Sequence, residues 1–302
     1  MPTLRSFPAS ALALALSSIL AARSAAAQAV DPLHGPTIAL ADSTFIPMEL
    51  PDGRAIVPVM LNGRGPYRLA VETGSPDVLV SPRVVAELGL RAIGPGETDS
   101  LFQLESLRIG ESVLGSLQVG RDNAFAQLGV DGVLGLIAFR DVVLTIDYPG
   151  RRLALSRAGL PEPDGREVLR AVWVGPFIGI PVQLGAVRET GVIDTQGGVG
   201  FQATPAVAAG LTFQGPLRVV GRAVVGGGAP VEVKMGVLGG DARLGRYSLR
   251  QPRIAVHPLP ADIPSRVTIG LEVLRDFAVA IDQRSMTVRL TRPDTGTVVP
   301  AP

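Results

Sequence analysis

The chain has 302 residues, of which 46% are apolar and 4% aromatic, and a formal net charge of +1, which is typical of a globular protein with one or two hydrophobic cores. Because the charge is near zero and the arginines are scattered singly, the sequence argues against a nucleic-acid partner. The absence of cysteine excludes disulfides and thiolate chemistry, and the two histidines leave little material for a metal site or a Ser-His-Asp triad, so we expect no metal and no cofactor.

Residues 1–29 have the pattern of a secretory signal peptide. Arg5 supplies the positive region, Ala11 to Ala22 the apolar region, and Ala25-Ala26-Ala27 or Ala27-Gln28-Ala29 a small-residue cleavage site. The apolar region is short and rich in alanine, which favours a cleaved signal over an uncleaved membrane anchor. We therefore expect export to a periplasm or to the outside of the cell, with no stable membrane span after cleavage.

The rest of the chain favours turn-rich β structure. Residues 30–50 show little periodicity and are predicted to form a leading arm, and Asn62-Gly63 is a hairpin turn signal. A short helix is predicted over 82–88, with proline at its start and Gly89 as its stop. The predicted strands of the first half are 56–61, 67–71, 78–80, 104–109, 113–119, 142–146 and 152–155.

Much of this pattern occurs a second time. Gly135 lies 25 residues after Gly110, as Gly270 lies 25 residues after Gly245, and Pro82 to Leu90 matches Pro205 to Leu211. We infer a duplication, in which the fused pair of lobes removes the usual need for a homodimer, so we expect a monomer. The predicted segments are an N-terminal lobe at 51–160, a linker at 161–170, a C-terminal lobe at 171–292 and a disordered tail at 293–302.

Two short stretches at equivalent points of the repeats carry the candidate chemistry. One runs from Leu69 to Ser75 and contains Glu72, and the other runs from Gly191 to Gly197 and contains Asp194. A carboxylate that ends a buried strand is costly unless donors satisfy it, and proteins accept that cost where the carboxylate has a function. A pseudo-twofold arrangement of the repeats would bring Glu72 and Asp194 together.

These features resemble the pepsin-like and retropepsin-like aspartic proteases, and the secreted bacterial members with two fused lobes are closest in character. The resemblance rests on the duplicated acid-Thr-Gly turns, on Asp131-Gly132-Val133-Leu134-Gly135 and on the stretch from Val142 to Pro149. It implies an all-β, duplicated two-lobe β-barrel fold with a cleft between the lobes. It also implies an aspartic-type endopeptidase that acts on peptides or proteins without a cofactor.

By position, the resemblance makes Glu72 and Asp194 the catalytic dyad. Two carboxyls held about 3 Å apart share one proton, so that one can take a proton from water while the other donates to the substrate carbonyl. Thr73 and Thr195 would lock the loops to each other, and the Gly74 N–H and the Ser75 hydroxyl would support the first carboxylate. The second loop is completed by Gln196 and Gly197.

The sequence departs from the family pattern at two of these positions. Glu72 stands where the family has Asp, and one extra methylene moves the carboxylate by more than about 1 Å. Gln196 stands where the family has Gly, and it would be strained if that position needs a φ that only Gly adopts easily. Three hypotheses stay open: a peptidase, a catalytically impaired protein that binds peptide or another ligand in the cleft, and a purely structural envelope protein.

Weaker signals have competing interpretations. The tract Gly226-Gly227-Gly228 is typical of a hairpin tip, either a flap over the cleft or an ordinary surface hairpin. Asp294-Thr295-Gly296 matches the acid-Thr-Gly string but lacks a preceding apolar strand, so we interpret it as tail. His257 is expected to be a surface residue at a strand end, and Trp173 is expected to pack in the core or between the lobes.

Overall fold

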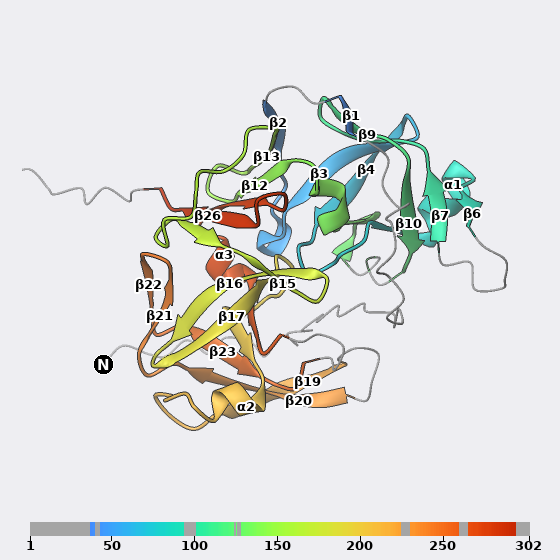
Figure 1. The fold of residues 1–302 in the computed structure, drawn as a ribbon. Coiled ribbons are helices and arrows are strands. Elements are labelled where there is room, and N and C mark those ends of the chain that lie inside the picture. The colour runs from blue at the N-terminus through green and yellow to red at the C-terminus, as the bar shows by residue number, and fades with distance from the viewer. Residues whose placement is uncertain are drawn as a thin grey trace, which may run out of the picture.

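The computed structural model describes residues 37–39, 43–93, 101–123, 125, 128–224, 230–259 and 265–293. Figure 1 shows two β-rich lobes, the first coloured blue to green and the second yellow to red. Helical structure in these residues is limited to short segments. They are η1 (Pro51–Gly53), α1 (Pro82–Leu88), η3 (Leu136–Phe139), α2 (Pro205–Ala208) and α3 (Leu271–Leu274).

The first lobe is built on one ten-stranded sheet with the order β1-β9-β8-β3-β4-β11-β5-β10-β7-β6. The hairpin signal is confirmed, since Asn62 and Gly63 both have positive φ at the turn between β3 and β4. Helix α1 begins and ends as predicted, with a Ser81 cap and left-handed Gly89. The strands are β1 (Thr37–Ala39), β3 (Ile56–Leu61), β4 (Arg64–Val71), β5 (Leu79–Val80), β6 (Arg91–Ala92), β7 (Leu101–Leu104), β8 (Leu107–Ile109), β9 (Ser112–Leu114), β10 (Leu117–Arg121) and β11 (Gly132–Leu134).

The second lobe repeats the central part of this arrangement. Its sheet has the order β19-β20-β23-β18-β24-β17-β16-β21-β22, and β15 pairs with β16 beside that path. The strands are β15 (Val172–Val174), β16 (Phe177–Leu184), β17 (Val187–Ile193), β18 (Phe201–Ala203), β19 (Arg218–Val224), β20 (Pro230–Val237), β21 (Asp241–Leu244), β22 (Tyr247–Arg250), β23 (Arg253–Val256) and β24 (Val267–Ile269).

Strand pairing confirms the duplication. In the first lobe β4 pairs in parallel with β11, which pairs antiparallel with β5. In the second lobe β17 pairs in parallel with β24, which pairs antiparallel with β18. Both acidic residues therefore follow a central strand that is held on one side by a parallel neighbour, and each lobe positions its acid in the same way.

A six-stranded sheet joins the lobes, in the order β14-β26-β25-β12-β13-β2. Its centre has twofold symmetry: Val143 pairs with Asp282, Thr145 with Ala280 and Asp147 with Ala278. Since Asp282 is the counterpart of Asp147, the pseudo-twofold axis passes between Thr145 and Ala280. The strands are β2 (Ser43–Pro47), β12 (Val143–Asp147), β13 (Arg152–Ser156), β14 (Val168–Arg170), β25 (Ala278–Asp282) and β26 (Thr287–Thr291).

The segments expected to be an arm and a linker both contribute strands to this sheet. β2, from the 30–50 segment, pairs with β13, and β14, from the 161–170 segment, pairs with β26. They occupy the two edges of the sheet, so each repeat begins with an edge strand. This symmetry includes more of the chain than the sequence repeats indicated.

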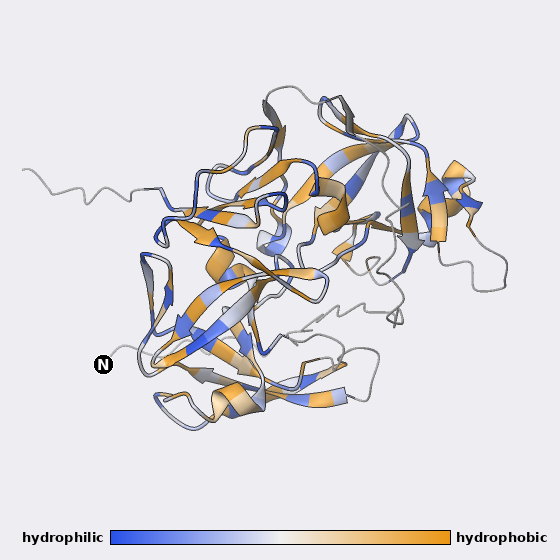
Figure 2. Ribbon diagram, viewed as in Figure 1, coloured by the Kyte–Doolittle hydropathy of each residue, from blue (hydrophilic) through white to orange (hydrophobic). Residues whose placement is uncertain are grey.

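The all-β, two-lobe prediction is confirmed, but the β-barrel description is wrong. The sheets are open paths of strands, and the core is enclosed by the packing of twisted sheets and the six-stranded sheet rather than by a closed ring. Figure 2 shows apolar residues along the strands and mostly polar turns between them. One continuous hydrophobic cluster includes residues of both lobes. Among the described residues, no helix is long and apolar enough to span a membrane.

Candidate active site

Each acidic residue is fixed by the parallel strand beside it. The Glu72 N–H donates to the Leu134 carbonyl at 3.0 Å, and the Asp194 N–H donates to the Ile269 carbonyl at 3.0 Å. Leu134 and Ile269 end β11 and β24, so the two acids leave their strands at equivalent points. Glu72 is buried, with 6% of its surface exposed, whereas Asp194 is partly exposed.

Reciprocal threonine hydrogen bonds hold the two acid loops against each other. The Thr73 hydroxyl donates to the Ile193 carbonyl at 2.7 Å, and the Thr195 hydroxyl donates to the Val71 carbonyl at 2.9 Å. The Thr73 N–H donates to the Thr195 hydroxyl at 3.0 Å, and the Thr195 N–H donates to the Thr73 hydroxyl at 3.2 Å. Both threonines are buried. The loops that carry Glu72 and Asp194 therefore meet across the lobe boundary.

We expect Thr195→Val to destabilise the protein by about 1–3 kcal/mol, because the isosteric change leaves the buried Thr73 N–H without its acceptor and removes the hydroxyl donor to the Val71 carbonyl. Denaturant unfolding measures the effect. Thr212→Val, at an exposed position of the second lobe, is the matched control and should change stability by less than about 0.5 kcal/mol. Equal stability of the two variants would show that the threonine contacts do not hold the lobes together.

Close approach of glycine backbone shapes the surroundings of the Asp194 carboxylate. Its Oδ1 accepts hydrogen bonds from the N–H groups of Gln196 at 3.0 Å and Gly197 at 2.9 Å. A Cβ placed on Gly74 would lie 2.8 Å from Oδ1, and one on Gly197 would lie 2.7 Å from Oδ2. Side chains at either position would displace the carboxylate, so the two glycines leave room for it.

Burial and charge make the two acids unequal. Burial, reinforced by the nearby charge of Asp194, raises the pKa of Glu72 to about 8, although Arg54 opposes the shift. Burial also raises the pKa of Asp194, but there the N–H groups of Gln196 and Gly197 and the Arg54 charge favour the ionised form. The donors to Asp194 thus favour its ionised form, and the raised pKa of Glu72 favours its protonated form.

Gln196 has no backbone strain of the kind expected. Neither Gln196 nor its counterpart Gly74 adopts a positive φ. Its buried side chain donates from Nε2 to the Val71 carbonyl at 3.3 Å, and its Oε1 is buried without a hydrogen-bond partner among the described residues. At the equivalent position, Gly74 lies against the Asp194 carboxylate, where a Cβ would come within 2.8 Å of Oδ1, so glycine there provides space rather than a positive φ.

Two supporting contacts differ from the expectation. The Ser75 hydroxyl donates to the Asp77 carbonyl at 3.0 Å, and the Ser75 N–H donates to the backbone carbonyl of Glu72. Gly74 lies against Asp194 rather than supporting the Glu72 carboxylate. Ser75 therefore hydrogen-bonds within the backbone of its own loop, and Gly74 makes room for the Asp194 carboxylate of the opposite lobe.

Polar side chains behind Asp194 were missed at the sequence level. The Gln202 Nε2 lies 2.9 Å from where a Gly197 Cβ would be and has no hydrogen-bond partner among the described residues. The Tyr148 hydroxyl is likewise buried, and burial together with the Asp194 charge raises its pKa. Gln202 lies in a run of small and apolar residues, which gave no signal of its location.

Two single-residue expectations are wrong. His257 is 1% exposed, because its ring lies between the Pro258 carbonyl at 2.7 Å and the Gln202 Oε1 at 2.9 Å, and burial lowers its pKa. The preceding apolar residues of β23 could have indicated this burial. Trp173 is 52% exposed. It lies on the short strand β15, which pairs with β16 alone and lies outside the main strand order of the sheet.

Other candidate positions yield no site. The glycine tract 226–228 lies outside the described residues, although the flanking strands β19 and β20 form an antiparallel pair. Asp294-Thr295-Gly296 also lies outside them. In the part of the chain that the structure describes, no group of three or more His, Asp or Glu side chains could hold a metal ion.

Comparison with known proteins identifies the fold. No protein-family model and no curated protein matches the sequence. The structure is similar to the crystal structure of an aspartic proteinase from Irpex lacteus, with a TM-score of 0.53 and 12% identity over 85% of this chain and 99% of that chain. A retropepsin-like aspartic protease from Rickettsia conorii matches 39% of this chain and 92% of its own length, with a TM-score of 0.30 and 18% identity. The similarity to the Irpex lacteus enzyme covers both lobes, and the chain therefore has the two-lobe fold of the aspartic proteinases.

Proposed function

We propose that the chain is an aspartic-type peptidase in which Asp194 and Glu72 act on one water molecule. The threonine contacts that hold the two acid loops together are the observation that carries the proposal. Asp194, ionised and aligned by two N–H groups, takes a proton from the attacking water. Glu72, protonated, donates to the carbonyl oxygen of the scissile peptide bond.

Cleavage of a fluorogenic peptide library, with and without a statine-type inhibitor, tests this function. We expect inhibitor-sensitive cleavage of peptide bonds by the purified protein. Absence of cleavage at every pH between 3 and 9 would overturn the proposal.

We further propose that the protein works as an exported monomer, which is supported by the signal-like residues 1–29 and by the presence of both acid loops in one chain.

The pH range of activity should extend to neutral pH. The reactive state holds one proton on the pair, and it persists up to the pKa of Glu72, which is raised to about 8. We expect kcat/KM to fall above about pH 8 as Glu72 loses its proton, and to fall in acid as Asp194 gains one. A pH profile from 3 to 10 measures both limbs. Activity restricted to pH values below 5 would contradict this proton assignment.

A second candidate function is ligand binding without hydrolysis, and Gln196 favours it. By the twofold symmetry of the loops, we infer that its Cβ takes up on the Glu72 side the space that Gly74 leaves open on the Asp194 side, and its amide is buried against the Val71 carbonyl. In the proposed peptidase, the longer glutamate at position 72 compensates for Gln196 by carrying its carboxyl past the Cβ. The two departures from the family pattern then form one functional unit.

This compensation predicts that Glu72 and Gln196 are coupled. Glu72→Asp alone should lower kcat/KM by about 100-fold, since the shortened carboxyl is displaced by more than 1 Å. Gln196→Gly in the same chain should recover most of that loss, because it reopens the space for an aspartate. Steady-state kinetics of the two single variants and the double variant measure the coupling. An inactive wild type together with an active double variant would favour the ligand-binding function instead.

A further inference from the structure

The outer face of the six-stranded sheet contains a hollow remote from the acid loops. Successive residues of each strand point to opposite faces, so Leu144 and Ile146 of β12 are buried while Thr145 and Asp147 point outward. The hollow has a volume of about 430 Å³, in the usual range of small-molecule sites. None of its lining residues belongs to the loops around Glu72 and Asp194.

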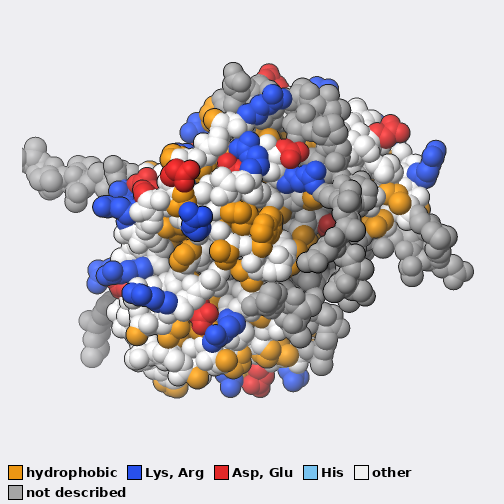
Figure 3. Space-filling view, in the orientation of Figure 1, with side chains coloured by type: hydrophobic (Ala, Val, Ile, Leu, Met, Phe, Trp, Pro, Cys, Tyr) orange, Lys and Arg blue, Asp and Glu red, His pale blue; other side chains and the backbone are white. Residues whose placement is uncertain are grey.

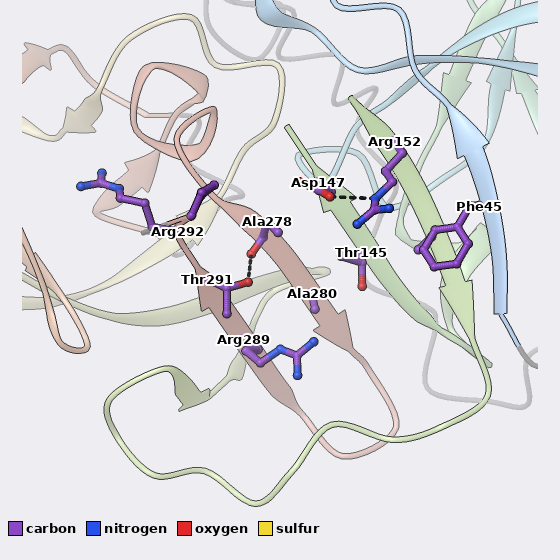
Figure 4. A pocket seen from close by; sticks show the side chains of 11 residues that line it. Phe45, Thr145, Asp147, Arg152, Ala278, Ala280, Arg289, Thr291 and Arg292 are labelled. Atoms are coloured by element: carbon purple, nitrogen blue, oxygen red, sulfur yellow. Dashed lines mark hydrogen bonds and ion pairs between the residues drawn. The ribbon is translucent and has the colours of Figure 1, made fainter. Parts of the chain in front are cut away.

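Strand register explains the hollow. Phe45, Ala154, Thr145, Ala280 and Arg289 are consecutive cross-strand neighbours on this face. The three small residues form a floor across the pseudo-twofold axis, with the 59% exposed Phe45 at one end and Arg289 at the other. Figure 4 shows Phe45 and Arg289 on opposite sides of Thr145 and Ala280. One end of the hollow is therefore aromatic and the other cationic.

The described residues that line the hollow include three arginines and one acidic residue, Asp147, so their net charge is positive. Arg152 donates to Asp147 at 2.9 Å and stacks on Phe45 with its guanidinium carbon 5.0 Å from the ring centre. Arg292 stacks on Phe277 and donates to Asp276 outside the hollow. Figure 3 shows basic and acidic side chains close together over β12, β13 and β26.

Two arginines lining the hollow have donors that their surroundings leave unused. The Nε atoms of Arg289 and Arg292 are buried and have no hydrogen-bond partner among the described residues. These Nε atoms are closed off from the hollow, so a ligand meets the terminal guanidinium nitrogens of Arg289, which lines it, and a carboxylate matches the planar geometry that arginine favours. The structure therefore provides an anion site next to an apolar floor.

We propose that this hollow binds a small organic carboxylate with an apolar arm. The carboxylate lies against Arg289, and the arm lies over Thr145 and Ala154 toward Phe45. The positive charge of the hollow should give a carboxylate higher affinity than a neutral analogue. Its apolar floor should give a carboxylate with an apolar arm higher affinity than a small inorganic anion. This inference does not depend on the proposed peptidase activity, because binding is measured without a reaction.

Isothermal titration of the full chain with 4-phenylbutyrate tests the proposal. We expect binding with Kd below about 1 mM that weakens with added salt, together with at least tenfold weaker binding of the neutral 4-phenylbutanamide and of butyrate. Equal affinity for the neutral amide would overturn the anion assignment. Equal affinity for butyrate or inorganic phosphate would overturn the assignment of an apolar arm.

Variants locate the binding to this face. Arg289→Gln should weaken 4-phenylbutyrate binding at least tenfold, Arg289→Lys less, and Ala154→Leu, at a partly exposed floor position, should abolish binding by filling the floor. Arg243→Gln, which removes an exposed arginine on β21, is the matched control and should bind as wild type. Wild-type affinity in both Arg289→Gln and Ala154→Leu would place the ligand elsewhere and overturn the proposal. Unchanged thermal unfolding of each variant shows that binding, not folding, has changed.

Discussion

Asp194→Asn is expected to lower kcat/KM for peptide cleavage by about 10³-fold or more while leaving the fold intact. The asparagine side-chain oxygen can still accept the N–H groups of Gln196 and Gly197, so the loop keeps its shape. It carries no negative charge, however, and cannot take a proton from the attacking water. Steady-state cleavage of the best library peptide measures the loss, and thermal unfolding checks that the variant is folded.

The control for this prediction is Asp241→Asn, which neutralises an exposed acid on β21 whose partner is Ser248. It should retain wild-type kinetics. The cleavage that remains in Asp194→Asn should also lose its sensitivity to a statine-type inhibitor. If Asp194→Asn keeps more than a tenth of the wild-type kcat/KM, Asp194 is not the base and the proposed mechanism fails.

The duplicated framework could be predicted because it depends on spacing. Glycines at close backbone approaches recur at fixed offsets, and Gly135 and Gly270 both lie where a Cβ would collide with backbone carbonyls. Because both lobes contain this close backbone contact, both repeats require glycine at the equivalent position, and the requirement is visible in the sequence. The equivalence of Glu72 and Asp194 is indicated by local pattern instead, since each acid follows an apolar run, precedes a threonine and lies shortly before the matching segments that start at Pro82 and Pro205.

The edge strands could not be predicted in the same way. β2 and β14 are short, and each is stabilised by pairing with a strand more than a hundred residues later in the chain. Their local sequences contain proline or charge and no alternating pattern. Only the assembled six-stranded sheet gives them partners, so tertiary context determines their structure.

The departures within the site show a related limit. The sequence predicts backbone strain at Gln196, whereas in the structure neither Gln196 nor Gly74 has a positive φ, and Gly74 is instead a close approach to the Asp194 carboxylate. The sequence pattern does not distinguish a glycine needed for positive φ from one needed for close approach. For His257, the apolar residues of β23 indicate burial, but its hydrogen-bond partner Gln202 lies 55 residues earlier in the chain and has no local signal.

The unequal pair also has a consequence for folding. A buried carboxyl whose proton is held up to about pH 8 in the folded protein releases it near its ordinary value of 4.5 in the unfolded chain. Between these two values the folded state binds one more proton than the unfolded state, so stability decreases as pH rises. The burial that keeps Glu72 protonated, as the proposed peptidase requires, thus lowers stability at neutral and alkaline pH.

Glu72→Gln is therefore expected to stabilise the protein at pH 8 by on the order of 4 kcal/mol relative to its effect at pH 4, because glutamine stays neutral where the buried glutamate must ionise. The difference in unfolding free energy between variant and wild type should rise through the interval from pH 4.5 to 8 and level off above it. Denaturant unfolding at unit pH steps measures this curve. Glu105→Gln, which removes an exposed carboxyl of the first lobe, should give a flat difference. A flat curve for Glu72→Gln as well would mean that Glu72 is ionised in the folded protein at neutral pH, and the proton would then have to be assigned to Asp194 or to neither acid.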